Sequence, residues 1–287
     1  MYLPDFAYHV PGTPEEVVAL LARSPGARVI AGGTDLLVKM KQGLVAPPAL
    51  VSLKRLDGLK RIAPEPGGLF IGARVTLNEL INSDLIRGKY ASIAGAAAQM
   101  ANNQVRHTGT LGGNLANAVP SADLPPILIA LGARAVVLGP DGERRFPLEE
   151  LFTGPGRTRL AEGEILTGVT VPEQETTGST YLKFGLRRSG ALAVVGVAVA
   201  VTMEGPVVRQ ARIVLGAVAP VPMRARAAEE TVRGREFDRS LAEEAGVAAA
   251  AESRPISDIR GSAEYRRDLV RVFTRRALER AVRDGHV

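Results

Sequence analysis

The chain has 287 residues, a formal net charge of +6 at pH 7 and no cysteine. Without cysteine it forms no disulfide, uses no thiolate as a nucleophile and offers no thiolate ligand to an iron–sulfur cluster. The positive charge raises nucleic acid as a partner, but only 4% of the residues are aromatic and the basic residues are scattered along the chain. We therefore expect no nucleic-acid binding, and an arginine-rich surface that forms ion pairs instead.

The N-terminal residues show no charged region followed by an apolar one, so we expect no secretory signal. The longest apolar run, residues 191–201, is too short to span a bilayer and predicts a buried strand. These two features favour a cytoplasmic protein with no membrane span.

The first predicted helix begins after Thr13, which is a favoured N-cap residue. Pro14 stands at the first helical position and Glu16 completes a capping box. A short strand over residues 28–31 follows, and a glycine turn then leads into a helical segment that ends near Gly43.

Two further short strands are predicted over residues 49–53 and 69–73, and a turn rich in proline and glycine, residues 63–68, precedes the second of them. Thr76 and Glu79 form a second capping box, which predicts another helix. The run of small residues from 90 to 101 predicts a buried helix.

The sequence then predicts a hairpin with a Pro140-Asp-Gly turn and a strand over residues 164–171. The polar segment 173–180 marks a boundary, and two long strands over 192–202 and 207–218 come after it. The last helix carries an expected apolar stripe of four residues at helical spacing: Tyr265, Leu269, Val272 and Phe273.

Familiar catalytic patterns are missing from the sequence. It contains no phosphate-binding G-x-x-x-x-G-K-[ST] and no G-x-S-x-G, and no G-x-G-x-x-G lies on a strand-turn-helix unit. The three histidines, His9, His107 and His286, are far apart and show no metal-ligand spacing. We therefore predict no metal site and no independent acid–base catalytic residue in this chain.

The stretch "AGGTDLL", residues 31–37, follows a strand and opens a helix. Its backbone amides can converge on an anion, with help from the helix N-terminus. Glycine at position 32 would let a phosphate approach the backbone, and Thr34 can add a hydroxyl donor. On this stretch alone, a plain strand-to-helix turn is an equally good interpretation.

A second glycine-rich stretch runs from residue 109 to residue 123. Glycine is costly in the interior of a regular element, so we predict a loop here that offers amides, Thr110, Asn114 and Ser121 to a ligand. Gly112 is expected where the backbone approaches a phosphate. Asp123 either accepts hydrogen bonds from ribose hydroxyls or caps the helix that follows it, and the pattern leaves both roles open. Two such loops suggest a diphosphate-bearing cofactor between them.

"AGGTDLL" and "TLGGNLANAVPSADLPP" together resemble the FAD-binding medium subunit of the molybdenum hydroxylases, the family of carbon monoxide dehydrogenase flavoprotein subunits and of the flavin domain of xanthine dehydrogenase. "GLRRSGALAVVGVAVAV", "VLGAVAPVPMRA" and "SAEYRRDL" extend the resemblance over essentially the whole chain. It implies an α+β fold. A two-part FAD-binding domain of the vanillyl-alcohol oxidase type covers residues 1–175, with subdomains that divide near 55–60. A smaller C-terminal domain of antiparallel sheet and helices covers 178–287.

Carried over residue by residue, the resemblance implies two diphosphate loops. The first comprises Val29, Ile30, Ala31, Gly32, Gly33, Thr34, Asp35 and Leu36, and the second comprises Thr110, Leu111, Gly112, Gly113 and Asn114. Asp123 matches an acid near the ribose, Leu166 a residue beside the adenine, and Lys183 a lysine near the cofactor. From the residues alone, Leu166 is equally well an ordinary strand core residue, and Lys183 a solvated strand lysine. Met100 takes the place of an aromatic residue found in some relatives, where it can cover the ring as an apolar lid.

The resemblance further implies that FAD binds without a covalent link, because no histidine, cysteine or tyrosine obviously stands where such a link would form. It implies an electron-transfer subunit that receives electrons from a [2Fe-2S] small subunit and passes them to NAD, a quinone or another acceptor. Hydroxylation would take place on a molybdopterin large subunit. The alternatives are a non-redox scaffold or binding module with a degenerate flavin fold, and a nucleic-acid binder that uses the arginines. A yellow purified protein would favour the first interpretation alone.

Overall fold

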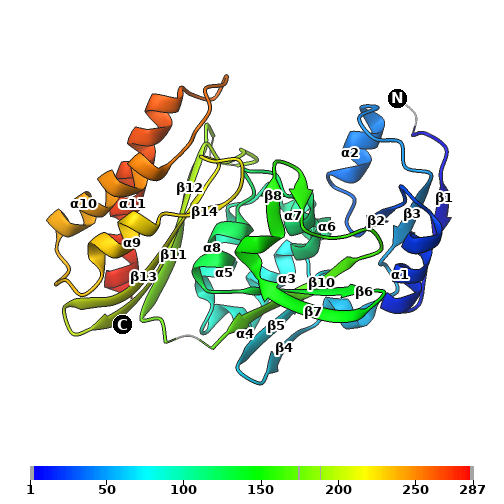
Figure 1. The fold of residues 1–287 in the computed structure, drawn as a ribbon, viewed down its shortest axis with the longest axis horizontal. Helices are drawn as coiled ribbons and strands as arrows, with labels where there is room; N and C mark the ends of the chain where they lie inside the picture. Colours follow the sequence, from blue (N-terminus) through cyan, green and yellow to red (C-terminus); the bar gives the residue numbers. More distant parts are fainter. Residues whose placement is uncertain (1–2, 174, 188, 285–287) are drawn as a thin grey trace.

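The computed structural model describes residues 3–173, 175–187 and 189–284. Three parts follow one another along the long axis of Figure 1: a small N-terminal sheet with two helices, a central sheet with its helices, and a C-terminal sheet covered by the last helices. Mixed helices and antiparallel sheets confirm the predicted α+β class. Within the described residues, no helix has both the length and the apolar composition needed to cross a bilayer.

The N-terminal part is a three-stranded parallel sheet in the order β1-β3-β2. Its elements are β1 (Ala7–His9), α1 (Pro14–Arg23), β2 (Arg28–Ile30), α2 (Leu36–Lys41) and β3 (Ala49–Ser52). Thr13 caps α1, because its hydroxyl accepts from the Glu16 N–H at 3.2 Å. The capping-box prediction is wrong in its second half, since the Glu16 carboxylate accepts from the Gly12 N–H at 2.7 Å and not from the N-cap residue.

The central sheet is antiparallel, in the order β4-β5-β10-β6-β7. Its strands are β4 (Ile62–Glu65), β5 (Gly68–Gly72), β6 (Arg134–Gly139), β7 (Gly142–Pro147) and β10 (Ile165–Pro172). The hairpin of β6 and β7 is confirmed. Residues 62–65 form a strand where we predicted only a turn. Pro64 is tolerated there because β4 is an edge strand, where the missing N–H breaks no ladder on its open side.

Six helices connect or cover these strands: α3 (Leu77–Asn82), α4 (Asp84–Arg87), α5 (Ala91–Ala98), α6 (Asn103–Thr108), α7 (Leu111–Asn117) and α8 (Leu124–Ala130). The capping box of Thr76 and Glu79 at the start of α3 is confirmed. Short elements complete this part: η1 (Asp57–Lys60), η2 (Leu148–Leu151), β8 (Phe152–Gly154) and β9 (Arg157–Thr158).

The C-terminal sheet has the order β11-β12-β13-β14 and is antiparallel. Its strands are β11 (Gly178–Phe184), β12 (Val195–Glu204), β13 (Val207–Gly216) and β14 (Met223–Arg224). Helices α9 (Arg226–Val232), α10 (Arg239–Glu252) and α11 (Ala263–Asp284) cover one face (Figure 1). The valines of β12 face these helices, whereas Ala198 and Ala200 belong to the core that includes α5 and α8. The continuous apolar run therefore reflects a strand buried on both faces.

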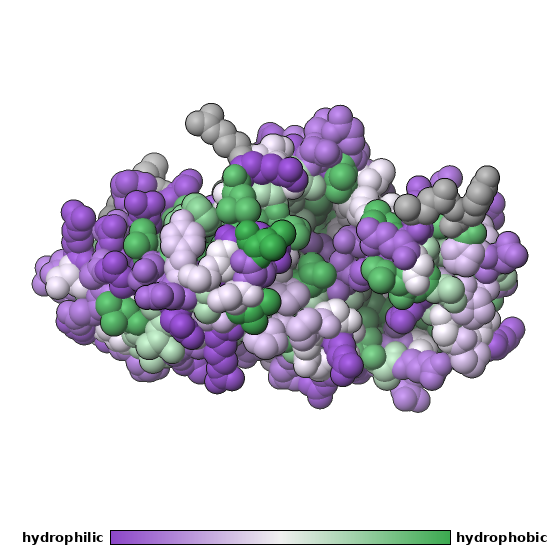
Figure 2. Space-filling model, turned by 90° about the horizontal axis from the view of Figure 1, so that it is seen from above, coloured by the Kyte–Doolittle hydropathy of each residue, from purple (hydrophilic) through white to green (hydrophobic). Residues whose placement is uncertain are grey.

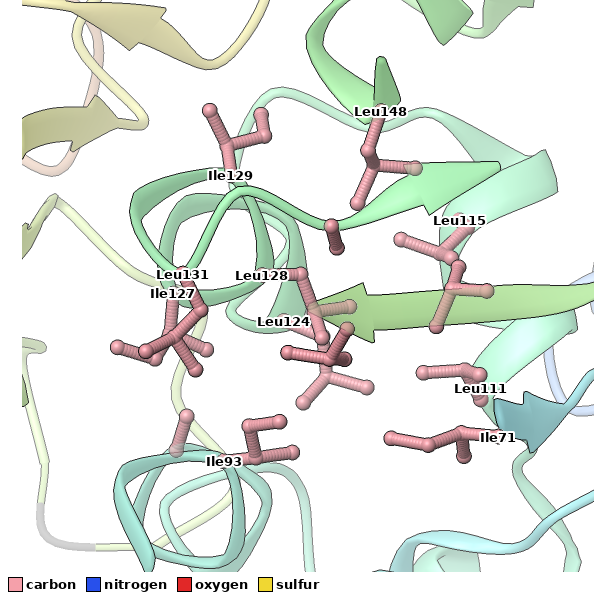
Figure 3. Packing of buried hydrophobic residues seen from close by; sticks show 14 of the residues in the cluster. Ile71, Ile93, Leu111, Leu115, Leu124, Ile127, Leu128, Ile129, Leu131 and Leu148 are labelled. Carbon is pink, nitrogen blue, oxygen red and sulfur yellow. The ribbon is translucent and has the colours of Figure 1, made fainter. Parts of the chain in front are cut away.

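Helix α8 occupies the centre of the larger core, and all seven of its residues are buried. Figure 3 shows Leu124 and Leu128 of α8 among side chains from several elements, including Ile93 of α5, Leu111 and Leu115 of α7, and Ile71 of β5. The helices and the central sheet are thus joined by one hydrophobic cluster, which fixes the positions of the loops between them.

The apolar stripe predicted for α11 is confirmed only in part, because Leu269 and Phe273 pack against the C-terminal hydrophobic core. Tyr265 is 44% exposed, and Leu269, Val272 and Phe273 are only partly buried. The buried face instead carries Val270, Ala277, Leu278 and Ala281, with Arg266 and Thr274 between them. Small residues are needed there because α10 and α11 approach closely: a Cβ at Gly246 would lie 2.5 Å from the Arg271 carbonyl oxygen.

Candidate functional site

A cleft of about 860 Å³, which we call the main cleft, opens between the N-terminal part and the central part. The face seen in Figure 2 is hollowed between these two parts of the molecule. Both glycine-rich stretches line the main cleft, together with the loop 158–164 that precedes β10 and residues 190–192 that precede β12. Segments far apart in the sequence thus meet in one concave site.

The first motif, residues 31–37, leaves β2 and enters α2. Among the described residues, the N–H groups of Ala31 through Leu36 find no protein acceptor, and the Thr34 hydroxyl has no protein partner. Gly33 has φ +69°, a left-handed conformation that glycine adopts without strain. Successive amides in such a turn form a concave cluster of donors that suits an anion. The motif therefore presents a set of unused donors to the main cleft.

Gly32 also has a reason to be glycine that we did not predict. A Cβ at this position would lie 1.8 Å from the Thr108 carbonyl oxygen, so the first motif rests directly on the backbone at the end of α6. The requirement comes from contact within the protein, whatever else approaches the motif. A larger residue at position 32 would push the two segments apart.

The second motif, residues 110–114, is not the loop that we predicted but the start of α7. Its amides from Leu111 to Asn114 already have protein acceptors, whereas the Thr110 N–H has none among the described residues. Leu111 N–H donates to the Val75 carbonyl, Gly112 N–H to the Ala73 carbonyl, and Gly113 N–H to the Thr110 hydroxyl, which caps the helix. The helical cost of two glycines is offset because Leu111 and Leu115 are fully buried in the core (Figure 3).

Gly112 is buried and does not line the main cleft. A Cβ there would lie 2.6 Å from the Cβ of Ala73, so this glycine allows α7 to pack against the end of β5. Gly113, in contrast, is exposed and lines the main cleft. Gly112, the predicted point of backbone approach, is therefore closed off by the protein, whereas Gly113 leaves room for a ligand.

Asn114 supplies an unused acceptor in the main cleft. Its side-chain Oδ1 is buried and has no hydrogen-bond partner among the described residues. A buried polar atom without a partner is costly, so such an atom in a cleft indicates a ligand that donates to it. Asn117, one turn further along α7, accepts from the Lys39 ammonium group of α2 at 2.6 Å. That bond links the two sides of the main cleft, and no sequence pattern predicted it.

Asp123 lines the main cleft at the start of α8, where it is 5% exposed. Its side chain makes no capping hydrogen bond, which contradicts the helix-cap role. Instead Oδ1 accepts from the Tyr181 hydroxyl at 2.7 Å and Oδ2 accepts from Lys183 Nζ at 2.8 Å. Lys183 also donates to the Gln99 carbonyl at 3.2 Å. Its side chain is only 7% exposed, so it is not a solvated strand lysine.

Burial is the largest cause of the pKa shifts of Asp123 and Tyr181. It raises the pKa of the Asp123 carboxyl above its ordinary value, against the opposing effects of Lys183 and Tyr181. Burial also raises the pKa of the Tyr181 hydroxyl well above its ordinary value, and the nearby Asp123 carboxylate adds to the effect. Tyr181 is therefore a neutral donor at physiological pH.

The main cleft gathers most of the predicted cofactor-binding residues. Those that line it are Val29, Ile30, Ala31, Gly32, Gly33, Thr34, Asp35, Leu36, Met100, Thr110, Gly113, Asn114, Ser121 and Asp123. Three of the predicted residues are instead buried in the core and do not line the main cleft: Leu111, Gly112 and Leu166. Lys183 does not line the main cleft either, but it is bonded to Asp123, which does.

Sequence reasoning missed the loop from 158 to 164, which lines the main cleft just before β10. Glu164 anchors this loop: its carboxylate receives two hydrogen bonds of 2.7 Å from Arg144 of β7 and another from the Ala161 N–H. The Arg144 hydrogen bonds lower the pKa of Glu164. No local signal marks these residues, because they reach the main cleft only through the strand order of the central sheet.

Comparisons with known proteins agree with this geometry. Residues 4–174 match the model of the FAD binding domain in molybdopterin dehydrogenase, and residues 180–281 match that of the CO dehydrogenase flavoprotein C-terminal domain. The chain is 35% identical to the carbon monoxide dehydrogenase medium chain of Hydrogenophaga pseudoflava, over 98% of both chains. It is 30% identical to the xanthine dehydrogenase FAD-binding subunit of Escherichia coli O157:H7, over 97% of both chains.

A chain in a solved structure of carbon monoxide dehydrogenase from Hydrogenophaga pseudoflava superimposes with a TM-score of 0.95 at 36% identity, over 99% of both chains. Fold and cleft together thus define a flavoprotein chain that binds FAD, as predicted. The chain belongs to the FAD-binding medium subunits of the molybdenum hydroxylases, and its relatives are oxidoreductase subunits.

The residues present fit FAD. The unused amides of the first motif match the oxygens of a diphosphate, which are acceptors only. The unpartnered Oδ1 of Asn114 needs a donor, and the hydroxyls of FAD are donors. The volume of the main cleft is also in the range of pockets that bind organic cofactors.

Proposed function

We propose that this chain relays electrons through its FAD from a [2Fe-2S] small subunit to an external acceptor, within an assembly that also contains a molybdopterin large subunit. FAD supplies the redox chemistry, since it can exchange electrons with one-electron centres and with two-electron acceptors. The names of the relatives as medium chains or FAD-binding subunits of dehydrogenases support the assembly. The acceptor is NAD, a quinone or another oxidant.

The observation that carries the proposal is the row of unused amides in the first motif, opposite the buried, unpartnered Oδ1 of Asn114. We assign the amides to the diphosphate and Asn114 to a hydroxyl donor of FAD. Gly113 leaves room for the cofactor, and Met100, which is 8% exposed at the wall, covers an apolar part of it. Asp123 and Lys183 hold a fixed charge pair beside the site.

The first experiment tests the cofactor and its attachment. Purified protein should be yellow, and acid precipitation should release FAD into the supernatant at one per chain. FMN in the supernatant would contradict the choice of cofactor, whereas flavin retained in the pellet would contradict noncovalent binding. A colourless chain that still assembles with its partner subunits would favour the non-redox scaffold instead.

The second experiment tests the relay in the assembled enzyme. The complex is reduced with limiting dithionite under anaerobic conditions, and NAD⁺, a quinone or dioxygen is then added in turn while the absorbance of the [2Fe-2S] centres is followed. With FAD present, one of these acceptors should reoxidise the centres. After the FAD has been removed, the same acceptor should reoxidise them much more slowly, and re-addition of FAD should restore the rate. Equal rates with and without FAD would overturn the relay.

A further inference from the structure

Lys39 of α2 reaches across the main cleft with a charge that no acid neutralises. Its ammonium group donates to Oδ1 of Asn117 on α7 at 2.6 Å, and both residues line the main cleft. Among the described residues, Lys39 forms no ion pair. Asn117 is neutral, so this bond leaves the positive charge of Lys39 uncompensated. The FAD contacts assigned above do not use that charge.

Lys39 lies on the same face of α2 as the end of the first motif. It follows Asp35 by four residues and Leu36 by three, and residues at these spacings are neighbours on a helix surface. All three line the main cleft. Side chains in a helix lean toward its N-terminus, which here is the end that joins the first motif. The helical rise from Leu36 to Lys39 is about 4.5 Å, which the flexible four-carbon stem of lysine can span.

A diphosphate at the first motif needs a cation that the motif itself does not contain. The motif offers neutral N–H groups, and its charged residue is the exposed acid Asp35. Among the described residues, two basic side chains line the main cleft, those of Arg28 and Lys39. Arg28 is exposed and begins β2, about 10 Å before Ala31 along the strand. Lys39 is half-buried and lies nearer to the motif, so it is the cation better placed to offset the charge of a diphosphate.

The acids of the main cleft do not claim Lys39. Asp123 is paired with Lys183. Glu164 is paired with Arg144. The other acids that line the main cleft are exposed to solvent, where an ion pair contributes little. The charge of Lys39 is therefore available to a ligand.

The bond between Lys39 and Asn117 is one that a ligand can replace. An ammonium group interacts more strongly with an anionic phosphate oxygen than with the neutral oxygen of an amide. Asn117 is only half-buried, so its Oδ1 can accept from water once Lys39 has left it. The exchange of partners thus compensates a charge and leaves no buried acceptor unpaired.

We propose that Lys39 is a further contact of the FAD diphosphate: it donates to Asn117 in the apo-protein and turns to a phosphate oxygen when FAD binds. Lys39 adds to the first motif the positive charge that the amides lack. Because the same lysine bridges the two sides of the main cleft, the bridge opens as the cofactor enters. The inference rests on the proposed placement of the diphosphate at the first motif.

FAD titration of the apo-protein tests the two ends of this bond separately. Lys39→Met should weaken FAD binding about ten- to a hundredfold, the range for loss of a charge-assisted hydrogen bond, and should make binding less sensitive to salt. Asn117→Ala should bind FAD at least as tightly as the wild type, because it removes only the competing acceptor. Lys41→Met is the matched control, since Lys41 is an exposed lysine of the same helix that does not line the main cleft. Wild-type affinity in Lys39→Met, or an equal loss in Asn117→Ala, would overturn the proposal.

Phosphorus NMR of the FAD-loaded protein identifies the contact itself. The diphosphate resonances of bound FAD should shift in Lys39→Met and also in Thr34→Val, which removes a hydroxyl of the first motif, but not in Lys41→Met. Resonances that respond to Thr34→Val and not to Lys39→Met would overturn the role of Lys39 and leave the placement of the diphosphate intact. Resonances that respond to neither variant would overturn the placement as well.

Discussion

The two walls of the main cleft satisfy their polar groups in opposite ways. On one wall, the first motif leaves the N–H groups of residues 31–36 without protein acceptors. On the other wall, the amides at the start of α7 are already bound, and Asp123 is paired with Tyr181 and Lys183. Two sequence motifs that both contain paired glycines therefore differ in whether their amides are free for a ligand or are hydrogen-bonded within the protein.

The difference shows that glycine pairs do not by themselves identify a phosphate cradle. Gly33 provides a left-handed turn, whereas Gly32 and Gly112 allow backbone segments of the protein to touch. Among the described residues, the first motif combines glycine with a run of unused amides, whereas the second motif leaves the Thr110 N–H alone without an acceptor. We call the wall formed by residues 31–36 the first wall, and the wall formed by the start of α7 and Asp123 the second wall. We assign the diphosphate to the first wall. The second wall contributes a rigid surface, Asn114 and a buried charge pair.

The largest expected effect comes from the second wall. Asp123→Asn leaves the buried Lys183 without its counter-charge, which costs about 3–5 kcal/mol when one partner of a buried pair is removed. The melting temperature of the apo-protein should fall by roughly 6 °C or more. This is the reverse of the result expected for a helix cap, where asparagine is as good as aspartate.

A double variant checks the cause. If the unpaired lysine is responsible, Lys183→Met in the Asp123→Asn background should recover part of the lost stability. A melting temperature unchanged in Asp123→Asn would show that the second wall does not depend on its internal charge pair, and the contrast between the walls would fail there.

The same added methyl group should have different effects in the two motifs. Gly32→Ala places a Cβ against the Thr108 carbonyl and should cost about 1–3 kcal/mol of stability, with loss of FAD binding. Gly113→Ala meets only the Thr110 hydroxyl, at 3.0 Å, and gains helix propensity of up to about 1 kcal/mol. Its melting temperature should change less, while its FAD affinity falls because the methyl group projects into the main cleft.

Thermal unfolding of both apo-proteins and FAD titration by flavin fluorescence are the measurements. If Gly113→Ala were as destabilised as Gly32→Ala, the two glycines would serve the same structural purpose and our distinction would be wrong.

The Asn114→Ala variant should lose affinity for FAD without losing stability of the apo-protein. Asn114→Ala removes the unpartnered Oδ1, so the apo-protein should be no less stable than the wild type, apart from the packing lost with the side chain. FAD affinity should fall by about tenfold, which corresponds to about 1.4 kcal/mol for one hydrogen bond. Titration calorimetry gives the affinity, and wild-type affinity in the variant would remove Asn114 from the site.

The smallest effect concerns the loop that sequence reasoning missed. The pKa of Glu164 is lowered from its ordinary value of 4.5, so its pairing with Arg144 stabilises the fold above that pH and is lost as the pH falls through the lower folded-state value. Glu164→Gln should cost less than about 1 kcal/mol at pH 7, because Arg144 is partly exposed to solvent.

Urea unfolding of wild type and Glu164→Gln across acidic pH measures this difference. It should shrink to nothing once the wild-type glutamate is protonated. A difference that stays constant with pH would mean that the charge of Glu164 contributes nothing.

Local patterns predicted the elements whose signals are local. The Thr76–Glu79 capping box and the hairpin of β6 and β7 are as the sequence indicated. The resemblance predicted the cofactor and the family. What local patterns missed depends on contacts between distant residues: α7 forms in spite of its glycines because Leu111 and Leu115 are buried in the core.

In the candidate site, too, features with a local sequence signal were predictable, and features that depend on contacts between distant residues were not. The unused donors of the first motif were predictable, because a strand, a glycine turn and a helix follow one another in the sequence. The true partners of Asp123 were not, since Tyr181 and Lys183 lie 58 and 60 residues away on β11. The close approach of Gly32 to Thr108 is hidden for the same reason.

Hydrogen–deuterium exchange of single amides, compared between the apo-protein and the FAD-loaded protein, tests the central claim most directly. The amides of residues 31–36 lack protein acceptors and should exchange rapidly in the apo-protein and become strongly protected when FAD binds. The amides of residues 111–114 are hydrogen-bonded in both states and should change little. Strong new protection at 111–114, with residues 31–36 still exchanging freely, would contradict the assignment of the diphosphate to the first wall.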